Sequence, residues 1–258
     1  MLMNILKKNI LFIVVAIIFA DIGCADNTIN QNFLVKTQRF TLPEHVISPE
    51  ESTIDLWATY YYLPQITDGS GDIPLRDKDG NELGPKLSLK DWCNSALEGS
   101  VRILLKSGEK VTYNYSGTSE EYQNDCSSFF KFNLGKTKFK LTSSTFGDGV
   151  NDYRLIPYRT IATNPELIPT GTLIYIPEAR GAIIELENGE TITHDGYFFA
   201  GDIGGAIKDN HIDVFIGIHE KSSFFPWIGS KPSSTFKAYI IHDLDLVNEI
   251  NTLHLSRD

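Results

Sequence analysis

Short strand-like segments separated by close turns run along most of this chain, and no other feature limits its fold as strongly. Residues 56–63 are aromatic and β-branched and stop at Pro64, while residues 212–218 are almost continuously apolar. Both compositions are typical of β-strands. Similar segments lie at 100–105, 109–115, 129–134, 138–142, 173–176, 183–186, 191–193, 197–200 and 236–241. Many short strands with close turns predict a mainly β fold, either a barrel or a sandwich.

The connections between these segments are rich in turn residues. Residues 68–84 predict a loop with a small hairpin, and residues 187–190 (Glu-Asn-Gly-Glu) predict a tight turn between two strands. The segments 129–134 and 138–142 are expected to pair with each other across a turn. The β-hairpin is therefore the expected local unit of much of the chain.

Only one segment has a clear helical signature. Residues 88–97 begin with Ser88, which can cap a helix, and Asp91 follows at the capping-box spacing with Asp in place of Glu or Gln. The C-terminal tail, residues 243–258, is either a second short helix packed on the domain or a loose end. One or two short helices are therefore expected beside the strands.

The N-terminus has the composition of an export signal. Lys7 and Lys8 precede an uninterrupted apolar run at residues 10–20. A helix that spans a membrane needs about 20 apolar residues, so this run is short for a span and typical of a signal peptide. Residues 1–25 are predicted to be a signal peptide or a lipoprotein signal, with an N-terminal membrane anchor as the alternative.

The boundary of this signal leaves two outcomes open. Cleavage after Ala20 or Ala25 releases a free domain, whereas lipidation at Cys24 anchors the chain to a membrane. Residues 26–52 are polar with scattered apolar positions and are expected to be an extended lead-in. In either case the protein is predicted to be exported to the periplasm or cell envelope.

The cysteine count fits an exported protein. The chain has three cysteines, and once Cys24 is assigned to the signal, Cys93 and Cys126 remain as a pair. Oxidising compartments favour a disulfide between them. Such a bridge closes a loop of roughly 30 residues and stabilises the fold by a few kcal/mol.

The charge of the chain excludes one class of partner. There are 33 acidic and 23 basic residues, for a formal net charge of −10. An acidic surface repels phosphate backbones, so no nucleic-acid partner is expected. No ligand spacing for zinc occurs, so no metal or cofactor is predicted. We expect a monomer.

Two carboxylates stand out within residues 194–220, because each lies in a nearly continuous apolar run. Asp202 and Asp213 both lie in strand-like surroundings, where a carboxylate is unfavourable unless it is paired or used. Desolvation raises the pKa of such an acid into the range useful for proton transfer. Gly204 and Gly205 follow the first aspartate and allow close approach of a ligand.

The chain between the two aspartates predicts that they meet. Asp209 and Asn210 can turn the chain and bring the second apolar run back beside the first. The two carboxylates would then share one locality. The alternative is that both only hydrogen-bond loop amides.

Two segments resemble the three-aspartate (3D) domain of the membrane-bound lytic transglycosylase A family. They are residues 168–181 (IPTGTLIYIPEARG) and residues 201–217 (GDIGGAIKDNHIDVFIG). The shared motifs are Ile-Pro-x-Gly-Thr before a strand, Asp-x-Gly-Gly-Ala-Ile-Lys, and Ile-Asp-Val-Phe. The resemblance covers about residues 154–242 and implies a six-stranded double-psi β-barrel. Residues 53–153 would then be an N-terminal β-rich part of the catalytic region.

The resemblance also implies an activity. The family cleaves the β-1,4 bond between N-acetylmuramic acid and N-acetylglucosamine in peptidoglycan and leaves a 1,6-anhydromuramoyl end. Hydrolases of glycosides commonly use two carboxyls, whereas here one can act as acid and then as base. By motif, that catalytic residue is Asp213, and Asp202 is an orienting or charge-tuning partner. The implied partner is the glycan strand of peptidoglycan.

Residues near these motifs are candidates for binding the glycan. Tyr61, in the aromatic segment TYYYLP, can stack on a sugar face or pack in the core, as can its neighbours and Trp92. Lys208 can hold a sugar acetyl group or a peptide carboxylate, or stay solvated. The residues predicted to bind substrate are Asn164, Lys208, Gly204, Gly205 and Tyr61.

One departure from the family pattern keeps alternatives open. Asn164 stands where the first family aspartate is expected, and an amide cannot carry that charge or exchange a proton at neutral pH. A non-catalytic, carbohydrate-binding double-psi barrel is therefore an alternative. Another is an NlpC-type cysteine peptidase with Cys126 as nucleophile and His194 as base. His194 and Asp195 are otherwise expected to form a surface turn.

Overall fold

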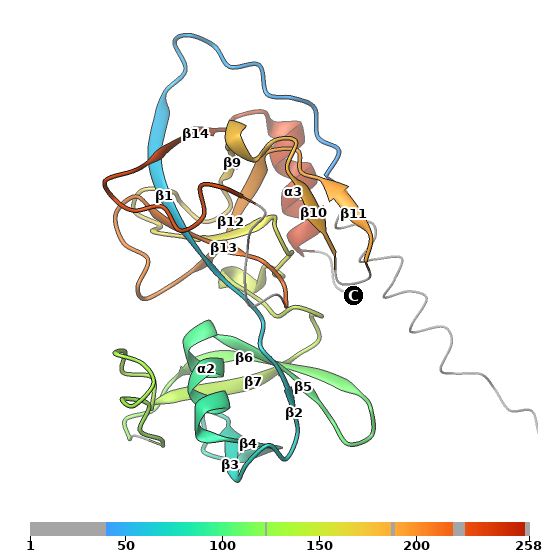
Figure 1. Cartoon of the computed structure of the whole chain (residues 1–258), viewed down its shortest axis with the longest axis vertical. Coiled ribbons are helices and arrows are strands. Elements are labelled where there is room, and N and C mark those ends of the chain that lie inside the picture. Colours follow the sequence, from blue (N-terminus) through green and yellow to red (C-terminus); the bar gives the residue numbers. More distant parts are fainter. Residues whose placement is uncertain (1–39, 122, 187–188, 219–224, 256–258) are drawn as a thin grey trace, which may run out of the picture.

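The computed structural model describes residues 40–121, 123–186, 189–218 and 225–255, so the predicted signal and Cys24 lie outside it. These residues form two parts, which lie one above the other in Figure 1. The upper part is a closed barrel and the lower part is a smaller β-sheet with one helix. Within the described ranges, no helix is long and apolar enough to cross a membrane.

Six strands close the barrel in the order β1-β13-β8-β12-β9-β14. The strands are β1 Thr53–Tyr61, β8 Thr160–Thr163, β9 Leu173–Tyr175, β12 Tyr197–Ile203, β13 His211–Phe215 and β14 Phe236–Ile240. β1 completes the ring because it pairs in parallel with β13 and antiparallel with β14. The predicted mainly β fold with a six-stranded barrel is confirmed.

Alternate residues of these strands fill the barrel. Because successive side chains on a strand point to opposite faces, every second residue reaches the interior. The fully buried members of this core include Leu56, Ala58, Ile161, Ile174, Phe198, Ile212 and Val214. The residues between them face the outside of the barrel, and the candidate site uses those.

The second part holds a four-stranded sheet in the order β2-β5-β6-β7. Its strands are β2 Gln65–Thr67, β5 Ser100–Leu104, β6 Lys110–Thr118 and β7 Thr137–Thr142. A small hairpin of β3 Ile73–Arg76 and β4 Glu82–Leu87 lies within the segment predicted to be a loop with a hairpin and continues to residue 87. The long strand β1 runs directly into β2, so one continuous segment joins the two parts (Figure 1).

The predicted helix is present as α2, Leu89–Glu98. Ser88 caps it by accepting the backbone N–H of Asp91, and Gly99 ends it in the left-handed conformation with φ 79°. The buried face of α2 carries Cys93, which forms the predicted disulfide with Cys126. The bridge ties α2 to the loop before β7, within one core.

The predicted pairing of residues 129–134 with 138–142 is wrong. β7 pairs with β6 instead, and residues 129–134 form no strand. Cys126 begins a turn there, because its carbonyl accepts the N–H groups of Phe129 and Phe130. Phe130 and Leu134 pack on the core of the second part, so the apolar residues of this loop are accommodated without a strand.

The C-terminal tail is a helix packed on the barrel. α3 spans Leu244–Leu255, and its Ile250 is buried. His254 stacks on Phe199 at 4.1 Å, and its Nε2 lies 3.1 Å from the hydroxyl of Thr160. Of the two alternatives for the tail, the packed helix is the one observed.

A small hairpin and short 3-10 helices complete the described structure. β10 Ile183–Glu185 pairs with β11 Thr191–Thr193 around the predicted turn, of which residues 187 and 188 lie outside the described part. Short 3-10 helices span Val150–Asp152 and Pro177–Ala179.

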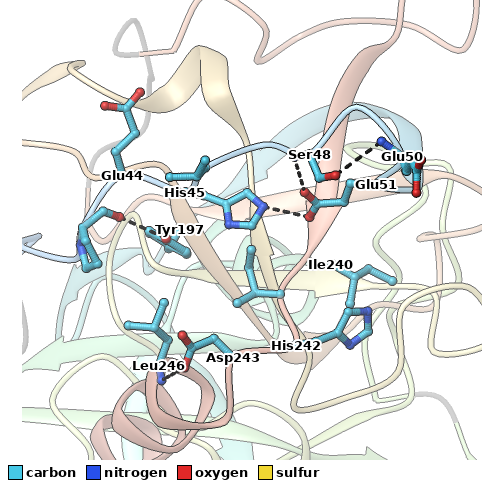
Figure 2. Close-up of a pocket in the computed structure, with 13 residues that line it drawn as sticks. Glu44, His45, Ser48, Glu50, Glu51, Tyr197, Ile240, His242, Asp243 and Leu246 are labelled. Carbon is cyan, nitrogen blue, oxygen red and sulfur yellow. Dashed lines mark hydrogen bonds and ion pairs between the residues drawn. The ribbon is translucent and has the colours of Figure 1, made fainter.

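Residues 40–51, which we call the strap, cross the barrel without forming a helix or strand. They belong to the predicted lead-in, and Phe40 and Leu42 are buried. Between the strap and α3 lies a cavity of about 560 Å³, where His45 binds Glu51 with 2.7 Å between Nε2 and Oε1 (Figure 2). This cavity contains neither predicted catalytic aspartate.

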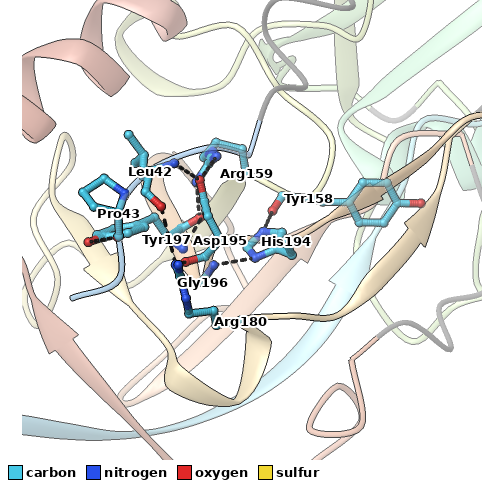
Figure 3. A network of polar contacts seen from close by, with 9 residues as sticks. All are labelled: Leu42, Pro43, Tyr158, Arg159, Arg180, His194, Asp195, Gly196 and Tyr197. Atoms are coloured by element: carbon cyan, nitrogen blue, oxygen red, sulfur yellow. Dashed lines mark hydrogen bonds and ion pairs between the residues drawn. The ribbon is translucent and has the colours of Figure 1, made fainter. Parts of the chain in front are cut away.

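A buried polar network fastens the strap (Figure 3). Asp195 accepts two hydrogen bonds from Arg159, at 2.8 and 2.9 Å, and one from the backbone N–H of Leu42 at 3.1 Å. The ring of Phe40 lies under the guanidinium of Arg159 at 4.2 Å. A buried ion pair with several hydrogen bonds holds its geometry tightly, so the strap has a fixed course over the barrel.

The prediction of a surface turn at His194 and Asp195 is therefore wrong. Their side chains are buried, and His194 hydrogen-bonds the carbonyl of Tyr158 and the N–H of Gly196. Desolvation lowers the pKa of His194 to about 3, so this histidine is neutral. The sequence did not indicate that the strap and Arg159 would cover this turn.

Candidate active site

Asp202 and Asp213 lie in one row across neighbouring strands of the barrel. The register pairs Asp213 with Thr59 of β1 on one side and with Ala162 of β8 on the other. Asp202 of β12 is the other neighbour of Ala162. Neighbours in register project to the same face of a sheet, so both carboxyls lie on the outside of the barrel with a small residue between them.

The two apolar runs meet through a third strand. The sequence predicted that the run of Asp213 returns beside that of Asp202, but β8 lies between β12 and β13. The shared neighbour Ala162 still keeps the two carboxyls in one locality. Strand order in a barrel depends on the whole ring, and the turn at Asp209 and Asn210 does not determine it.

A β-bulge places Asp202 in this row. Ala200 pairs with Ile161 and Asp202 pairs with Ala162, so Gly201 is an extra residue in β12. In a regular strand, Asp202 would point to the same face as Ala200, which is fully buried in the barrel core. The bulge reverses this alternation and turns the Asp202 carboxyl outward.

A chain of hydrogen bonds holds Asp213. The hydroxyl of Thr59 donates to Oδ1 of Asp213 at 2.8 Å, and the hydroxyl oxygen of Thr59 lies 2.8 Å from Nε2 of His211. Since Thr59 gives its only proton to Asp213, Nε2 of His211 must donate to Thr59. The His211 ring stacks on Trp57 with 3.6 Å between centroids and an angle of 2°. Each member of the chain therefore has one orientation.

The environment of Asp213 sets its protonation. Burial, with a smaller contribution from the charge of Asp202, raises the pKa of Asp213 to about 7, although the hydrogen bond from Thr59 lowers it. A carboxyl that titrates near neutral pH can both give and take a proton. Asp213 is therefore suited to act as a general acid and a general base.

Asp202 is held as the acceptor of two hydrogen bonds. The hydroxyl of Tyr61 donates to Oδ2 at 2.8 Å and the N–H of Ile203 donates to Oδ1 at 2.8 Å. Burial raises the pKa of Asp202 to about 6, and both hydrogen bonds lower it. Burial and the charge of Asp202 raise the pKa of Tyr61 well above its usual value, so its hydroxyl keeps its proton. Asp202 accepts two hydrogen bonds and Asp213 accepts one from Thr59, so the hydrogen bonding favours the ionised form of Asp202 more strongly.

Two side chains of this site were not predicted from the sequence. Thr59 carries no signal of its own in a β-branched strand, and its role follows from the register of β1 with β13. Glu98 ends α2 in the second part, and its carboxylate accepts the N–H of Tyr62 at 3.0 Å. Burial raises the pKa of Glu98 to about 8, with a further contribution from the charge of Asp213.

The other residues predicted to bind substrate differ in their contacts. Asn164 follows β8, and its side chain accepts the N–H of Glu166 at 3.2 Å, which caps a turn. Lys208 is exposed. No hydrogen bond or ion pair described for the chain joins either residue to the two aspartates. Gly204 would place a Cβ 2.8 Å from Ile207, whereas at Gly205 nothing lies within 4 Å. Gly205 is therefore the one that leaves open space.

The aromatic residues considered for stacking on a sugar differ in burial and in hydrogen bonding. Tyr61 uses its hydroxyl on Asp202 and is 9% exposed, so its ring offers little face to a sugar. Trp92 is fully buried in the second part, 5.8 Å from Phe139. Tyr62 accepts a hydrogen bond from Asn94 at 3.0 Å. Sugar stacking is excluded for Trp92 because its ring lies in the core.

The cysteine-peptidase alternative fails on geometry. The sulfur of Cys126 is bonded to that of Cys93 at 2.00 Å, so no thiol is present. His194 lies in the barrel core with the strap, whereas Cys126 belongs to the core of the second part. In the described ranges, no three His, Cys, Asp or Glu side chains gather as metal ligands.

Comparisons with known proteins agree with this architecture. Residues 159–224 match the family model of the 3D domain, as predicted from the motifs. The chain is similar to the solved structure of E. coli MltA with bound chitohexaose, with a TM-score of 0.50 and 17% identity over 72% of this chain and 71% of that one. It is also similar to a membrane-bound lytic murein transglycosylase from Agrobacterium tumefaciens, with a TM-score of 0.48 and 13% identity over 81% and 83% of the two chains. No curated protein matches the sequence.

Proposed function

We propose that this chain, a 3D-domain protein with the fold of E. coli MltA, is a peptidoglycan lytic transglycosylase. It cleaves the β-1,4 bond between N-acetylmuramic acid and N-acetylglucosamine and leaves a 1,6-anhydromuramoyl end. The observation that carries this proposal is the Asp213 carboxyl, with a pKa of about 7, held by Thr59 in a row with Asp202.

In the first step Asp213 is the general acid. Its Oδ1 accepts the hydroxyl of Thr59, so the acidic proton resides on Oδ2. That proton passes to the glycosidic oxygen as the bond from C1 of the muramoyl sugar to this oxygen breaks. The positive charge that develops at C1 is stabilised by the ionised Asp202 and by the new carboxylate of Asp213.

In the second step Asp213 is the general base. Its carboxylate takes the proton of the C6 hydroxyl of the same sugar, while O6 attacks C1 and closes the anhydro ring. The proton returned to Asp213 replaces the one given in the first step, so no water is consumed. One carboxyl with a pKa near neutral pH serves both steps.

The predicted export signal supports this function. Peptidoglycan lies outside the cytoplasmic membrane, and residues 1–25 have the pattern of a signal peptide or lipoprotein signal. We propose a location in the periplasm or cell envelope. Lipidation at Cys24 would keep the enzyme on a membrane beside the wall.

The test is product analysis of peptidoglycan incubated with the purified protein. Mass spectrometry is expected to find anhydromuropeptides from the wild type and none from Asp213→Asn. The variant should keep its circular dichroism spectrum, since asparagine still accepts the hydroxyl of Thr59. Full activity in folded Asp213→Asn would contradict the assignment of the acid.

The same experiment decides the remaining alternative. Asn164 in place of an aspartate favours a carbohydrate-binding barrel without activity. In this structure the side chain of Asn164 accepts the N–H of Glu166 and caps a turn. An asparagine at this position, in place of an aspartate, therefore leaves the hydrogen bonds of Asp213 and Asp202 in place. Binding to peptidoglycan without release of soluble fragments would support the binding module, and hydrated muropeptides would indicate a hydrolase.

A further inference from the structure

We infer that Glu98, the last residue of α2, is a positioning residue of this reaction and the third carboxyl of its site. The second part of the molecule contributes it, and it acts through Asp213 and through the end of β1. Its neutral form supports the loss of a proton by Asp213, and its ionised form opposes it. This inference rests on the proposed function.

The position of Glu98 is unfavourable for a carboxylate. It lies in the last turn of α2, where the helix dipole favours positive charge, and that turn holds no basic residue. The side chain is half-buried, and within the described part of the chain no basic side chain pairs with it. A glutamine would accept the N–H of Tyr62 equally well without this penalty. The hydrogen bond alone therefore does not explain a carboxyl here.

Glu98 holds the end of β1 that carries the site. Its Oε2 accepts the N–H of Tyr62 at 3.0 Å, and one turn earlier the amide of Asn94 donates to the hydroxyl of Tyr62 at 3.0 Å. α2 thus binds this residue at both its backbone and its side chain. The preceding residue is Tyr61, whose hydroxyl donates to Asp202. A shift of α2 would therefore move the hydroxyl of Tyr61 that donates to the carboxylate of Asp202.

Glu98 interacts electrostatically with Asp213 and with Tyr61. Asp213 raises the pKa of Glu98, and Asp202, Asp213 and Glu98 together raise the pKa of Tyr61. Burial raises the pKa of all three acids, to about 6 for Asp202, about 7 for Asp213 and about 8 for Glu98, and the two hydrogen bonds that Asp202 accepts favour its ionised form. At neutral pH Asp202 is ionised while Glu98 keeps its proton.

The protonation state of Glu98 affects the proton transfer by Asp213. When Asp213 gives its proton to the glycosidic oxygen, it becomes a second negative charge beside Asp202. A third charge on Glu98 would oppose this step, because like charges in a half-buried site disfavour further ionisation. The reacting form therefore holds protons on both Asp213 and Glu98. Because Asn164 supplies no carboxyl, Glu98 brings the number of acids in this site to three.

The pH dependence of kcat/KM tests this inference. Loss of two protons in the wild type gives log kcat/KM a slope of −2 above pH 8, whereas Glu98→Gln, which cannot ionise, gives a slope of −1. The matched control is Glu109→Gln, an exposed glutamate before β6, which should keep the slope of −2. Equal slopes in wild type and Glu98→Gln would overturn the inference.

A second measurement needs no activity. In protein labelled with ¹³C-glutamate, the carboxyl signal of Glu98, identified by its absence in Glu98→Gln, should titrate near pH 8. In Asp213→Asn it should titrate at lower pH, because the charge of Asp213 is gone. Titration of Glu98 near 4.5 in both proteins would also overturn the inference. If the wild type released no anhydromuropeptides, the proposed function would fail, and this titration would still decide whether Glu98 and Asp213 are coupled.

Discussion

At the scale of single residues, the hydroxyl of Thr59 decides how Asp213 can act. It donates to one oxygen of Asp213 and receives from His211, whose ring is held flat against Trp57. Burial lowers the pKa of His211, so this ring is neutral and donates through Nε2 only. Asp213 therefore presents its free oxygen, with the proton, in one direction.

Replacing Thr59 by valine is expected to change both rate and pH dependence. The hydrogen bond from Thr59 lowers the pKa of Asp213, so its loss raises that pKa and moves the alkaline limb of kcat/KM to higher pH. The rate at pH 6.5 should fall about tenfold to a hundredfold, because a hydrogen bond to a charged group contributes about 1.5–3 kcal/mol.

The matched variant Thr59→Ser separates positioning from packing. Serine keeps the hydroxyl and loses only the methyl group, so its pH profile should follow the wild type. A pH profile of Thr59→Val that coincides with that of Thr59→Ser would show that the hydroxyl does not act on Asp213.

At the scale of elements, the shape of β12 depends on its contact with the segment that enters the barrel. The bulge at Gly201 turns Asp202 outward, and Gly149 lies directly against it. A Cβ at Gly149 would lie 2.2 Å from the carbonyl oxygen of Gly201 and 3.2 Å from Cβ of Asp202. The glycine at 149 is therefore required by close approach of two backbones.

Gly149→Ala is expected to lower both stability and activity. The methyl group must displace the bulge, which overpacks this contact by about 1–3 kcal/mol and moves the Asp202 carboxyl. Thermal unfolding and kcat/KM measure the two effects. Gly205→Ala is the contrast for stability, since nothing lies within 4 Å of its Cβ position. An unchanged melting temperature in Gly149→Ala would contradict the described packing.

At the scale of the whole molecule, the site joins two parts that have separate cores. The barrel supplies Asp202 and Asp213, and the smaller part, with its own disulfide, supplies Glu98. Three half-buried acids with raised pKa values destabilise the folded protein at neutral pH, because the folded state binds protons more tightly than the unfolded chain. The folded protein is thus less stable at the place where the proposed function needs acids that titrate near neutral pH.

The Asp213→Asn variant should make this loss measurable. The pKa of Asp213 is raised from 3.8 to about 7 on folding, so its contribution to stability is lost as pH rises through this range. Thermal unfolding should find wild type and variant equally stable at pH 3.5. Above pH 8 the variant should be more stable by on the order of 4 kcal/mol, because each unit of a pKa shift corresponds to about 1.4 kcal/mol. A constant difference between the two proteins at every pH would show that the Asp213 carboxyl is not desolvated in the folded state.

The sequence by itself determined the features that rest on local patterns. The strand-like segments, the cap of α2 at Ser88, the cysteine pair and the motifs around Asp202 and Asp213 depend on neighbouring residues, so they can be identified from the chain alone. Where local pattern was insufficient, the predictions were wrong, as at residues 129–134, where apolar residues pack on a core without forming a strand.

Only the tertiary structure decided how these features meet. The order of strands around the barrel placed β8 between the two aspartates, and the register of β1 brought Thr59 to Asp213. The docking of α2 against the end of β1 placed Glu98 at the site. Contacts between residues far apart in the chain arise from packing and closure of the whole barrel, so no local pattern encodes them. For the same reason the pKa values of these acids, which depend on burial, belong to the folded molecule.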